Sequence, residues 1–501
     1  MKGVIVTAVL LAGSLCAPCQ STFIVQFDSV QSGHDASGRS IMETENGLIV
    51  FAWQHSDDGT GRMRGAVYKL APDGTFLSRY EVGTGELTGS YFGRWDPVTR
   101  MNTGGFASMF VRSNGYGYNI DMIRFDDNGD VLSFNDVMDS PPEDSIVVGS
   151  RQLRQTGDGG FVFCGAFSLP DGYAKALLVK LDSVGAVQWQ QTYDAVGQTH
   201  DAISVAPYVD GGYVLAGYRL PQGLNGLGFL IRTDSVGNEL WRRYFGDRSG
   251  GWCPVRVCGD GGIVVLSSYA ETGWPFGWYQ QLLVKYDGDG GLVWQTRCNY
   301  YANVTAFDME VLPDQSIIGV GTYSMVIGLT KYTASGDSAW CRLLHVFDNL
   351  DLHETYDVEL TSDGGFLLTG QASQGIGDPH PGQETIFVIK TDSLGCVIPG
   401  CQNVGVQEYA IDLQEHLAVS PNPASEQVNV VLALPETGEL EGSALVLLQD
   451  ASGRTVLEQP VLRNLNQLRA TVDVSALPAG LYYLHLRDQK RWLAGSKVIV
   501  E

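Results

Sequence analysis

Three histidines in the chain are each followed directly by an acidic residue. The pairs are His34-Asp35, His200-Asp201 and His353-Glu354. Imidazole nitrogens and carboxylate oxygens bind metal ions and transfer protons, so a fold that brings these pairs together would create a metal-binding or acid–base site. The alternative is that these polar residues lie at strand entries and form hydrogen bonds with loop backbone.

Aromatic residues in variable segments form a second group of candidates. They are Trp53, Tyr116, Tyr118, Trp252, Trp274, Trp278 and Tyr279, with His55 close to the first of them. Binding residues concentrate on variable loops held by a rigid scaffold, and exposed aromatic rings suit stacking on sugars or contact with a protein. The alternative is that these rings pack loop against loop.

Two acid-rich turns, Asp126–Asp130 and Asp287–Gly290, suggest calcium ligands. An EF-hand loop counted from Asp126 would need Gly at its sixth position and Glu at its twelfth, where the chain has Val131 and Val137. The Gly-x-Ser-x-Gly and His-Glu-x-x-His motifs of common hydrolases are absent from the sequence. We therefore predict structural turns, no cofactor and no metal site, and we keep calcium as the alternative.

The candidates are embedded in a repeat of about 50 residues, a period typical of propellers and solenoids. Every unit between residues 40 and 395 has two turn signatures. The first is a turn of the Asp-Gly-Gly type, at Glu45-Asn46-Gly47, Thr103-Gly104-Gly105, Asp158-Gly159-Gly160, Asp210-Gly211-Gly212, Asp260-Gly261-Gly262, Asp314-Gln315-Ser316 and Asp363-Gly364-Gly365. The second is a basic residue with Gly five positions later, at Lys69, Arg124, Lys180, Arg232, Lys285, Lys331 and Lys390. Both signatures predict tight connections between neighbouring strands.

Each unit therefore holds four short strands, and seven units predict an all-β fold that begins with a seven-bladed β-propeller. The first strand of each blade would line the central channel, so the histidine–acid pairs would lie at the channel mouth. The last unit lacks a good fourth strand, while Thr22–Asp28 is a spare strand-like run. We expect this run to complete the seventh blade and close the ring, so that the propeller spans residues 20–401. A β-solenoid is the structural alternative.

The C-terminal segment breaks the period. A linker over residues 402–416 is followed by strand-like runs with turn signals between them, which predict a small Ig-like β-sandwich over residues 417–501. Its marked positions are Pro421, Asn422, Pro423, Gly453, Gly480, Tyr482 and Lys497.

These positions, in this order, resemble the C-terminal sorting domain of proteins exported by the type IX (Por) secretion system of Bacteroidetes-type bacteria. The resemblance implies recognition by the type IX outer-membrane translocon. It also implies removal of the domain by a sortase-like peptidase, with cleavage between about Cys401 and Leu417. The Asp-Gly-Gly units are similar to the repeat propellers common in such exported proteins.

The N-terminus and the cysteines agree with export. Residues 1–19 form a predicted signal peptide, because Lys2 precedes an apolar run too short to span a bilayer. No later segment qualifies as a transmembrane helix. Cys396 and Cys401 flank a turn-like loop and form the expected disulfide, whereas Cys253 and Cys258 should point to opposite faces of one strand.

The composition narrows the partners. The net charge of −24 and the lack of a basic run argue against nucleic acid. We therefore expect a secreted or cell-surface propeller that binds an extracellular glycan or protein and is more readily a binder than an enzyme. Two alternatives stay open: a polysaccharide hydrolase or lyase at the channel mouth, and a structural surface-coat protein. Two carboxylates about 5–10 Å apart at the mouth would favour the enzyme.

Overall fold

The computed structural model describes most of the chain. The described residues are 22–27, 35–55, 62–83, 89–92, 97–113, 118–138, 148–168, 173–193, 198–221, 226–246, 253–270, 279–297, 304–323, 326–344, 346, 352–373, 384–398, 401, 416–434, 444–450, 453–464, 467–487 and 492–501. The expected signal peptide, most of the expected linker, His34, Tyr116, Trp252, Trp274 and Trp278 lie outside them. The backbones of Tyr118 and Tyr279 are described, but their side chains are not.

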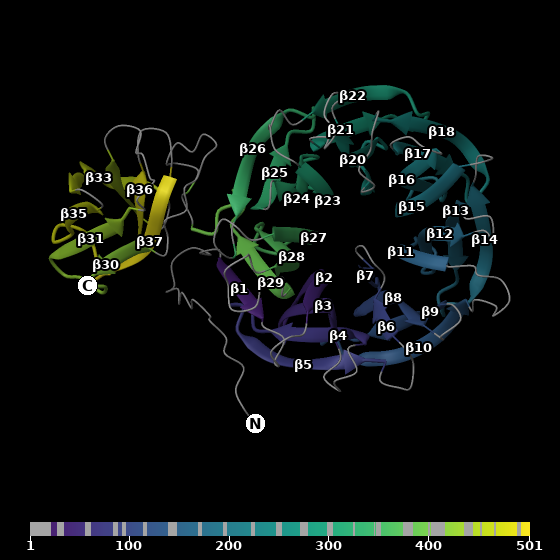
Figure 1. The fold of residues 1–501 in the computed structure, drawn as a ribbon, viewed down its shortest axis with the longest axis horizontal. Coiled ribbons are helices and arrows are strands. Elements are labelled where there is room, and N and C mark those ends of the chain that lie inside the picture. The colour runs from purple at the N-terminus through teal and green to yellow at the C-terminus, as the bar shows by residue number, and fades with distance from the viewer. Residues whose placement is uncertain are drawn as a thin grey trace. The chain divides into compact units, whose positions relative to one another are not determined.

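The repeats form antiparallel strand sets that stand around a common centre (Figure 1). The third to sixth sets are separate four-stranded sheets. They are β11 (Val148–Gln155), β12 (Phe161–Ser168), β13 (Ala174–Leu181) and β14 (Val187–Tyr193); β15 (Gln198–Pro207), β16 (Tyr213–Pro221), β17 (Leu227–Thr233) and β18 (Glu239–Phe245); β19 (Val255–Val257), β20 (Ile263–Ala270), β21 (Tyr279–Tyr286) and β22 (Leu292–Arg297); and β23 (Val304–Val311), β24 (Ile317–Tyr323), β25 (Val326–Tyr332) and β26 (Ser338–Leu344). In Figure 1 the first strand of each set lies nearest the centre and the fourth lies at the rim.

The first two sets share one nine-stranded sheet, which the sequence did not predict. They comprise β2 (Ala36–Thr44), β3 (Gly47–His55), β4 (Met63–Leu70) and β5 (Phe76–Val82), then β7 (Val98–Arg100), β8 (Phe106–Ser113), β9 (Tyr118–Phe125) and β10 (Val131–Met138). An extra strand, β6 (Gly89–Phe92), pairs with β4 on one side and β8 on the other. Phe92 holds β6 in place, because its buried ring meets Phe51 and Phe110 edge-on at 5.5 and 5.4 Å between centroids.

The N-terminal strand completes the last set. This sheet has the order β1-β29-β28-β27, with β1 (Phe23–Phe27), β29 (Glu384–Thr391), β28 (Phe366–Ser373) and β27 (Leu352–Leu360). The junction of this last set with the first set is called the seam below. Asp357 of β27 accepts hydrogen bonds from Ile41 N–H (2.7 Å) and Ser40 Oγ (3.0 Å) of β2, so the two ends of the repeat array are joined directly.

A similar contact links other neighbouring sets at their first or second strands. A side chain of one set accepts the backbone N–H of the next: Gln152 from Val205, Ser204 from Val255, Ser268 from Ala306 and Asp308 from Val358. β-Bulges interrupt the pairing of β15 with β16 and of β23 with β24, beside these bonds. A bulged residue leaves a backbone group unpaired, so the neighbouring set supplies the missing partner.

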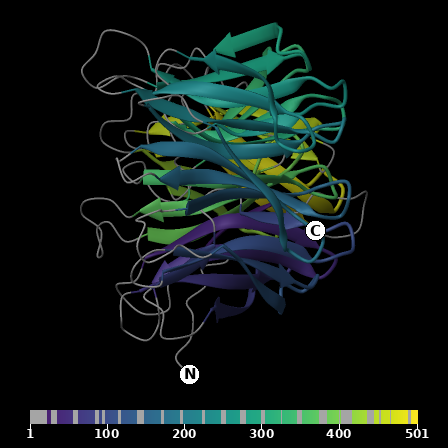
Figure 2. The same ribbon diagram turned by 90° about the vertical axis from the view of Figure 1, so that its right-hand side faces the viewer.

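The two turn signatures meet in space, which explains their joint recurrence. Lys180 is 4% exposed and lies 2.9 Å from Asp158 of the same set, and equivalent ion pairs join Lys285 with Asp260 and Lys390 with Asp363. The short turns that carry these acids gather along one side of the strand sets, at the right in Figure 2.

In three units, a tryptophan of the preceding set explains the Gly of the second turn signature. A Cβ added at Gly237 would lie 2.8 Å from the Trp189 ring of the preceding set, and Gly237 has a φ of 83°. Trp241 and Trp294 meet Gly290 and Gly336 in the same way. Apolar side chains of adjacent sets fill the rest of each interface: Val214, Ala216 and Leu230 of the fourth set pack with Ile263, Val265 and Val284 of the fifth. Burial between sheets, rather than one central core, holds the propeller together.

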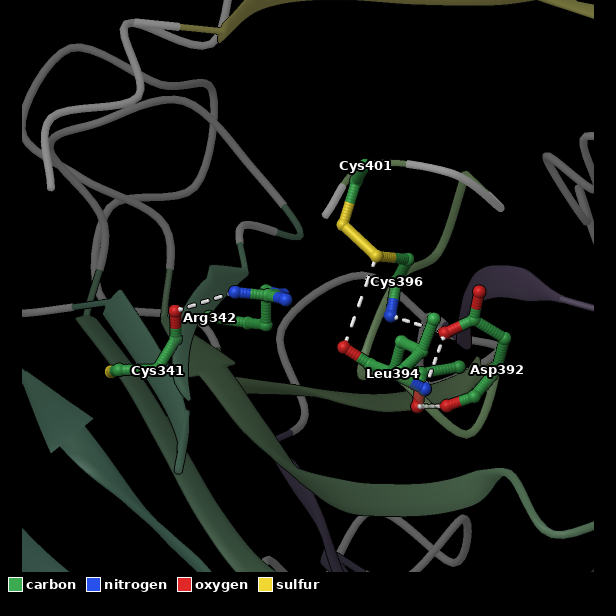
Figure 3. The surroundings of a disulfide bond; sticks show 7 residues. Cys341, Arg342, Asp392, Leu394, Cys396 and Cys401 are labelled. Atoms are coloured by element: carbon green, nitrogen blue, oxygen red, sulfur yellow. Dashed lines mark hydrogen bonds between the residues drawn. A yellow bond between two sulfur atoms is a disulfide. The ribbon is translucent and has the colours of Figure 1, made fainter. Parts of the chain in front are cut away.

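The C-terminal unit has two four-stranded sheets around its own core. One contains β30 (Leu417–Ser420), β31 (Gln427–Ala433), β35 (Gln467–Asp473) and β34 (Leu462–Asn464), and the other β33 (Thr455–Pro460), β32 (Leu445–Asp450), β36 (Gly480–Arg487) and β37 (Trp492–Val500). Before this unit, a disulfide joins Cys396 to Cys401 (Figure 3). Cys253 and Cys258 are buried and lie outside any disulfide. Within the described residues, no helix is long and apolar enough to cross a membrane.

Candidate functional site

The described members of the histidine–acid pairs lie in different surroundings. His200 and His353 are fully buried. The His200 ring lies 5.5 Å from that of Phe229, and His353 Nε2 accepts the Val346 N–H. Asp201 forms an ion pair with Arg151 at 2.7 Å. The fold thus holds these three side chains within the packing between strand sets.

Asp35 and Glu354, in contrast, converge at the seam. Asp35 directly precedes β2, and Glu354 lies near the start of β27, so both occupy strand ends opposite the tight turns. The two segments that carry these residues meet at β29, because Asp35 Oδ1 accepts the backbone N–H of Glu384 at 3.1 Å. Two of the predicted channel-mouth residues therefore belong to one cluster, to which Glu384 adds a third carboxylate.

Gln371 of β28 connects two of these carboxylates. Its Nε2 donates to Glu354 Oε2 at 2.9 Å and to Glu384 Oε1 at 2.8 Å. The side chain is only 6% exposed, and its Oε1 has no hydrogen-bond partner in the part of the chain that the structure describes. A buried acceptor without a donor is unfavourable, so this atom is a place where a ligand donor would be stabilised.

Arg39 supplies positive charge to the cluster. Its guanidinium carbon lies 3.8 Å from the centroid of Trp53 and 4.0 Å from that of Tyr356, so aromatic rings cover the group. Trp53 is half-buried, and its indole N–H donates to the Phe92 carbonyl. This predicted ligand-binding ring therefore faces an arginine.

The cluster carries more negative than positive charge. Burial raises the pKa of the Glu384 carboxyl above its usual 4.5, Asp35 and Glu354 raise it further, and Arg39 lowers it. Burial likewise raises the pKa of Tyr356, whose hydroxyl donates to Glu354 at 2.6 Å. His55 Nδ1 accepts the Asp35 N–H at 3.2 Å and lies 3.9 Å from Asp35 Oδ2.

Sequence reasoning missed Arg39, Tyr356, Gln371 and Glu384. Gln371 interrupts the otherwise apolar and small-residue strand Phe366–Ser373, and Glu384 opens the next strand of the same unit as Glu354. The available signal for these residues was the presence of polar residues at the same ends of the strands in the unit that contains Glu354.

The acid-rich turns use their carboxylates locally. Asp126 Oδ1 accepts the N–H groups of Asn128 and Asp130, and Asp287 Oδ1 accepts those of Asp289 and Gly291. These are the hydrogen bonds of a self-capped turn. Among the described residues, no group of three or more His, Cys, Asp or Glu side chains has the geometry to hold a metal ion.

The marked residues of the C-terminal unit lie on its strands and turns. The Asn422 side chain donates to the Lys497 carbonyl at 2.7 Å and accepts the Ile499 N–H at 2.8 Å, which links the opening Pro-Asn-Pro segment to the terminal strand β37. Tyr482 donates to the Pro478 carbonyl, and Gly453 takes a φ of 79° in the turn after β32. The opening and closing blocks thus form one structure although more than 70 positions separate them.

Comparison with protein families identifies the C-terminal unit. Residues 418–501 match the model of the secretion system C-terminal sorting domain. The chain is a type IX secretion substrate. It is therefore handled by the type IX system and exported to the cell surface or secreted.

The propeller has structural similarities but no curated relative. No curated protein matches the chain. A protein of unknown function from Dyadobacter fermentans aligns with 10% identity over 72% of this chain and 96% of its own, with a TM-score of 0.42. The β-propeller domain of the Trilobed protease from Pyrococcus furiosus aligns with 9% identity over 71% and 95%, with a TM-score of 0.39. A puromycin hydrolase aligns with 12% identity over 81% and 60%, with a TM-score of 0.45. These similarities carry no argument about function.

Proposed function

We propose that this type IX substrate is a seven-bladed propeller that binds an extracellular glycan at the seam and is delivered by an Ig-like sorting sandwich. The observation that carries the proposal is Gln371, a buried amide that joins Glu354 to Glu384 while its own carbonyl oxygen has no donor among the described residues. Sugar hydroxyls are hydrogen-bond donors, and clustered carboxylate and amide oxygens are their usual partners in binding sites.

The seven blades follow from counting the first two strand sets as separate blades, since each has its own inner strand and its own turns. The sortase-like peptidase would cut between about Cys401 and Leu417. Tyr116, Tyr118, Trp252, Trp274, Trp278 and Tyr279 stay candidates for further ligand contacts, while Trp53 and His55 would act by supporting Arg39 and Asp35.

A glycan array of the exported protein tests the proposal. We expect selective binding that Glu384→Gln weakens, because the amide keeps the shape of the side chain but loses its charge. A Trp274→Ala/Trp278→Ala variant tests the aromatic contacts separately. Glu81→Gln is the matched control, since Glu81 also accepts from a glutamine amide, Gln54, at 3.0 Å, but within the first set. Absence of selective binding by the folded protein would reject the glycan proposal.

A polysaccharide hydrolase is the second candidate, and one observation favours it. Glu354 Oε2 and Glu384 Oε1 accept from the same nitrogen, so they are no farther apart than the sum of its two bond distances, and the pKa of Glu384 is raised. A protonated carboxyl beside an ionised one is the arrangement of a general acid and its partner. Release of reducing sugar from an array-selected glycan, abolished in Glu384→Gln, would establish it.

A further inference from the structure

The seam offers a ligand acceptors rather than donors. Both amide hydrogens of Gln371 are used on Glu354 and Glu384, and the Tyr356 hydroxyl donates to Glu354. Within the described residues, Gln371 Oε1 has no donor and Glu384 accepts on Oε1 alone, which leaves its Oε2 open. A ligand that satisfies these atoms must itself donate several hydrogen bonds.

Charge restricts the ligand further. The Glu384 carboxyl is influenced by two further carboxylates, Asp35 and Glu354, and by one guanidinium, Arg39. Trp53 and Tyr356 lie against that guanidinium. His55 accepts the Asp35 N–H at Nδ1. Partly buried charge without a counter-charge is unfavourable, and a cationic group would relieve the repulsion among the three carboxylates. The described acids do not group in a way that holds a metal ion, which points to an organic cation.

We infer that the seam binds the ammonium group of an amino sugar with a free amine. This inference rests on the proposed glycan binding and names the sugar class. A protonated amine has three donors, which match the Gln371 carbonyl and the Glu354 and Glu384 carboxylates. Neighbouring ring hydroxyls can donate to Asp35, a match that the alkyl stem of a lysine side chain does not offer. An N-acetylated sugar lacks the charge and two of the three donors.

Isothermal titration of the exported protein with three matched oligosaccharides tests the inference. The ligands are β-linked tetramers of glucosamine, N-acetylglucosamine and glucose, with an acetyl-lysine-amide probe for a peptide amine. We expect the glucosamine tetramer to bind about 10- to 100-fold more tightly than the other three, the range of a lost hydrogen bond to a charged group. Glu384→Gln should remove this preference, and Glu81→Gln should keep it.

The pH dependence gives an independent readout. Affinity for the protonated amine should fall as the pH is lowered through the raised pKa of Glu384, because that carboxylate then loses its charge while Arg39 stays charged and Tyr356 stays neutral. Affinity for the glucose tetramer should change less.

The outcomes separate the inference from the proposed function. Equal binding of all three tetramers, or a preference that survives in Glu384→Gln, would overturn the amine inference and leave glycan binding standing. Tighter binding of the lysine probe would overturn it in favour of a peptide ligand, and Glu384-dependent binding of Ca²⁺ alone would overturn it in favour of a metal site. No binding of any sugar by protein with a cooperative melt would overturn both. Preference for the glucosamine tetramer with loss in Glu384→Gln would support both.

Discussion

Asp201 and Glu354 belong to the same motif, an acid after a histidine at the first strand of a repeat, yet their charge environments differ. Asp201 is 6% exposed at its side chain and is matched by Arg151 from the neighbouring set at 2.7 Å. Within the part of the chain that the structure describes, Glu354 forms no ion pair with an arginine and is joined through Gln371 to a second carboxylate. The same local pattern is thus structural where the adjoining set supplies a counter-charge, and we propose that it binds a ligand where the acid's own set supplies another carboxylate.

Removing the counter-charge at Asp201 should have the largest effect on stability. Arg151→Ala leaves a carboxylate buried and unpaired, which costs about 3–5 kcal/mol of unfolding free energy. Urea unfolding followed by tryptophan fluorescence measures the loss. The double change Arg151→Met with Asp201→Leu should recover much of it, because neither charge then remains buried. A cost below about 1 kcal/mol for Arg151→Ala would mean that the pair contributes no more than a surface ion pair.

Loss of an ion pair beside the Asp-Gly-Gly turns should have the next largest effect on stability. Lys180→Met removes a buried ammonium whose partner, Asp158, is more than half exposed, and we expect a loss of about 1–2 kcal/mol. Although burial raises it, hydrogen bonds from Thr156, Lys180 and the Gly160 N–H lower the pKa of Asp158 to about 2. Its contribution to stability is therefore present above its ordinary 3.8 and is lost as the pH falls toward 2.

Acid unfolding of the Lys180→Met variant checks this assignment. Without the lysine the pKa of Asp158 should rise, so the variant should differ most from the parent near neutral pH, and the difference should shrink below the ordinary Asp pKa. Arg454 is a suitable control, because it pairs with Asp450 while remaining 77% exposed. A constant difference down to acid pH would assign the effect of Lys180 to its packing.

The smallest effect, and one of opposite sign, is expected at the seam. The folded-state pKa of Glu384 is raised, so its ionisation disfavours the folded state, and stability should increase as the pH falls through that pKa. Glu384→Gln should therefore slightly stabilise the protein near neutral pH and remove this part of the pH profile. Thermal melts from neutral to mildly acidic pH measure it. Destabilisation by Glu384→Gln at neutral pH would show that the carboxylate is structural, as Asp201 is.

Much of the fold could be predicted because the turns repeat. Gly185, Gly237 and Gly290 follow their basic residues at a constant spacing, and the positive φ at each shows that this spacing marks the turn after the strand. Strand β6 could not be predicted, since Gly89–Phe92 shows no repeat signature and is held by Phe51 and Phe110 from other strands.

The candidate site could be predicted only in part, for a related reason. Asp35 and Glu354 are visible as motif residues, but their meeting depends on ring closure between chain segments more than 300 positions apart. Whether an acid in such a place is paired with a cation depends on side chains of other strands, and Arg151 and Gln371 carry no motif that distinguishes them. The partner of a buried side chain is a tertiary property that local spacing does not encode.

A crystal structure of the exported protein soaked with the glucosamine tetramer at neutral pH would show whether the seam binds the sugar amine. We predict the ligand amine within hydrogen-bond distance of Gln371 Oε1 and Glu384, with Gln371 still bonded to Glu354 and with Arg151 and Asp201 unchanged. A seam filled by a side chain of the protein itself, or a tetramer bound elsewhere with Gln371 Oε1 still without a donor, would contradict it.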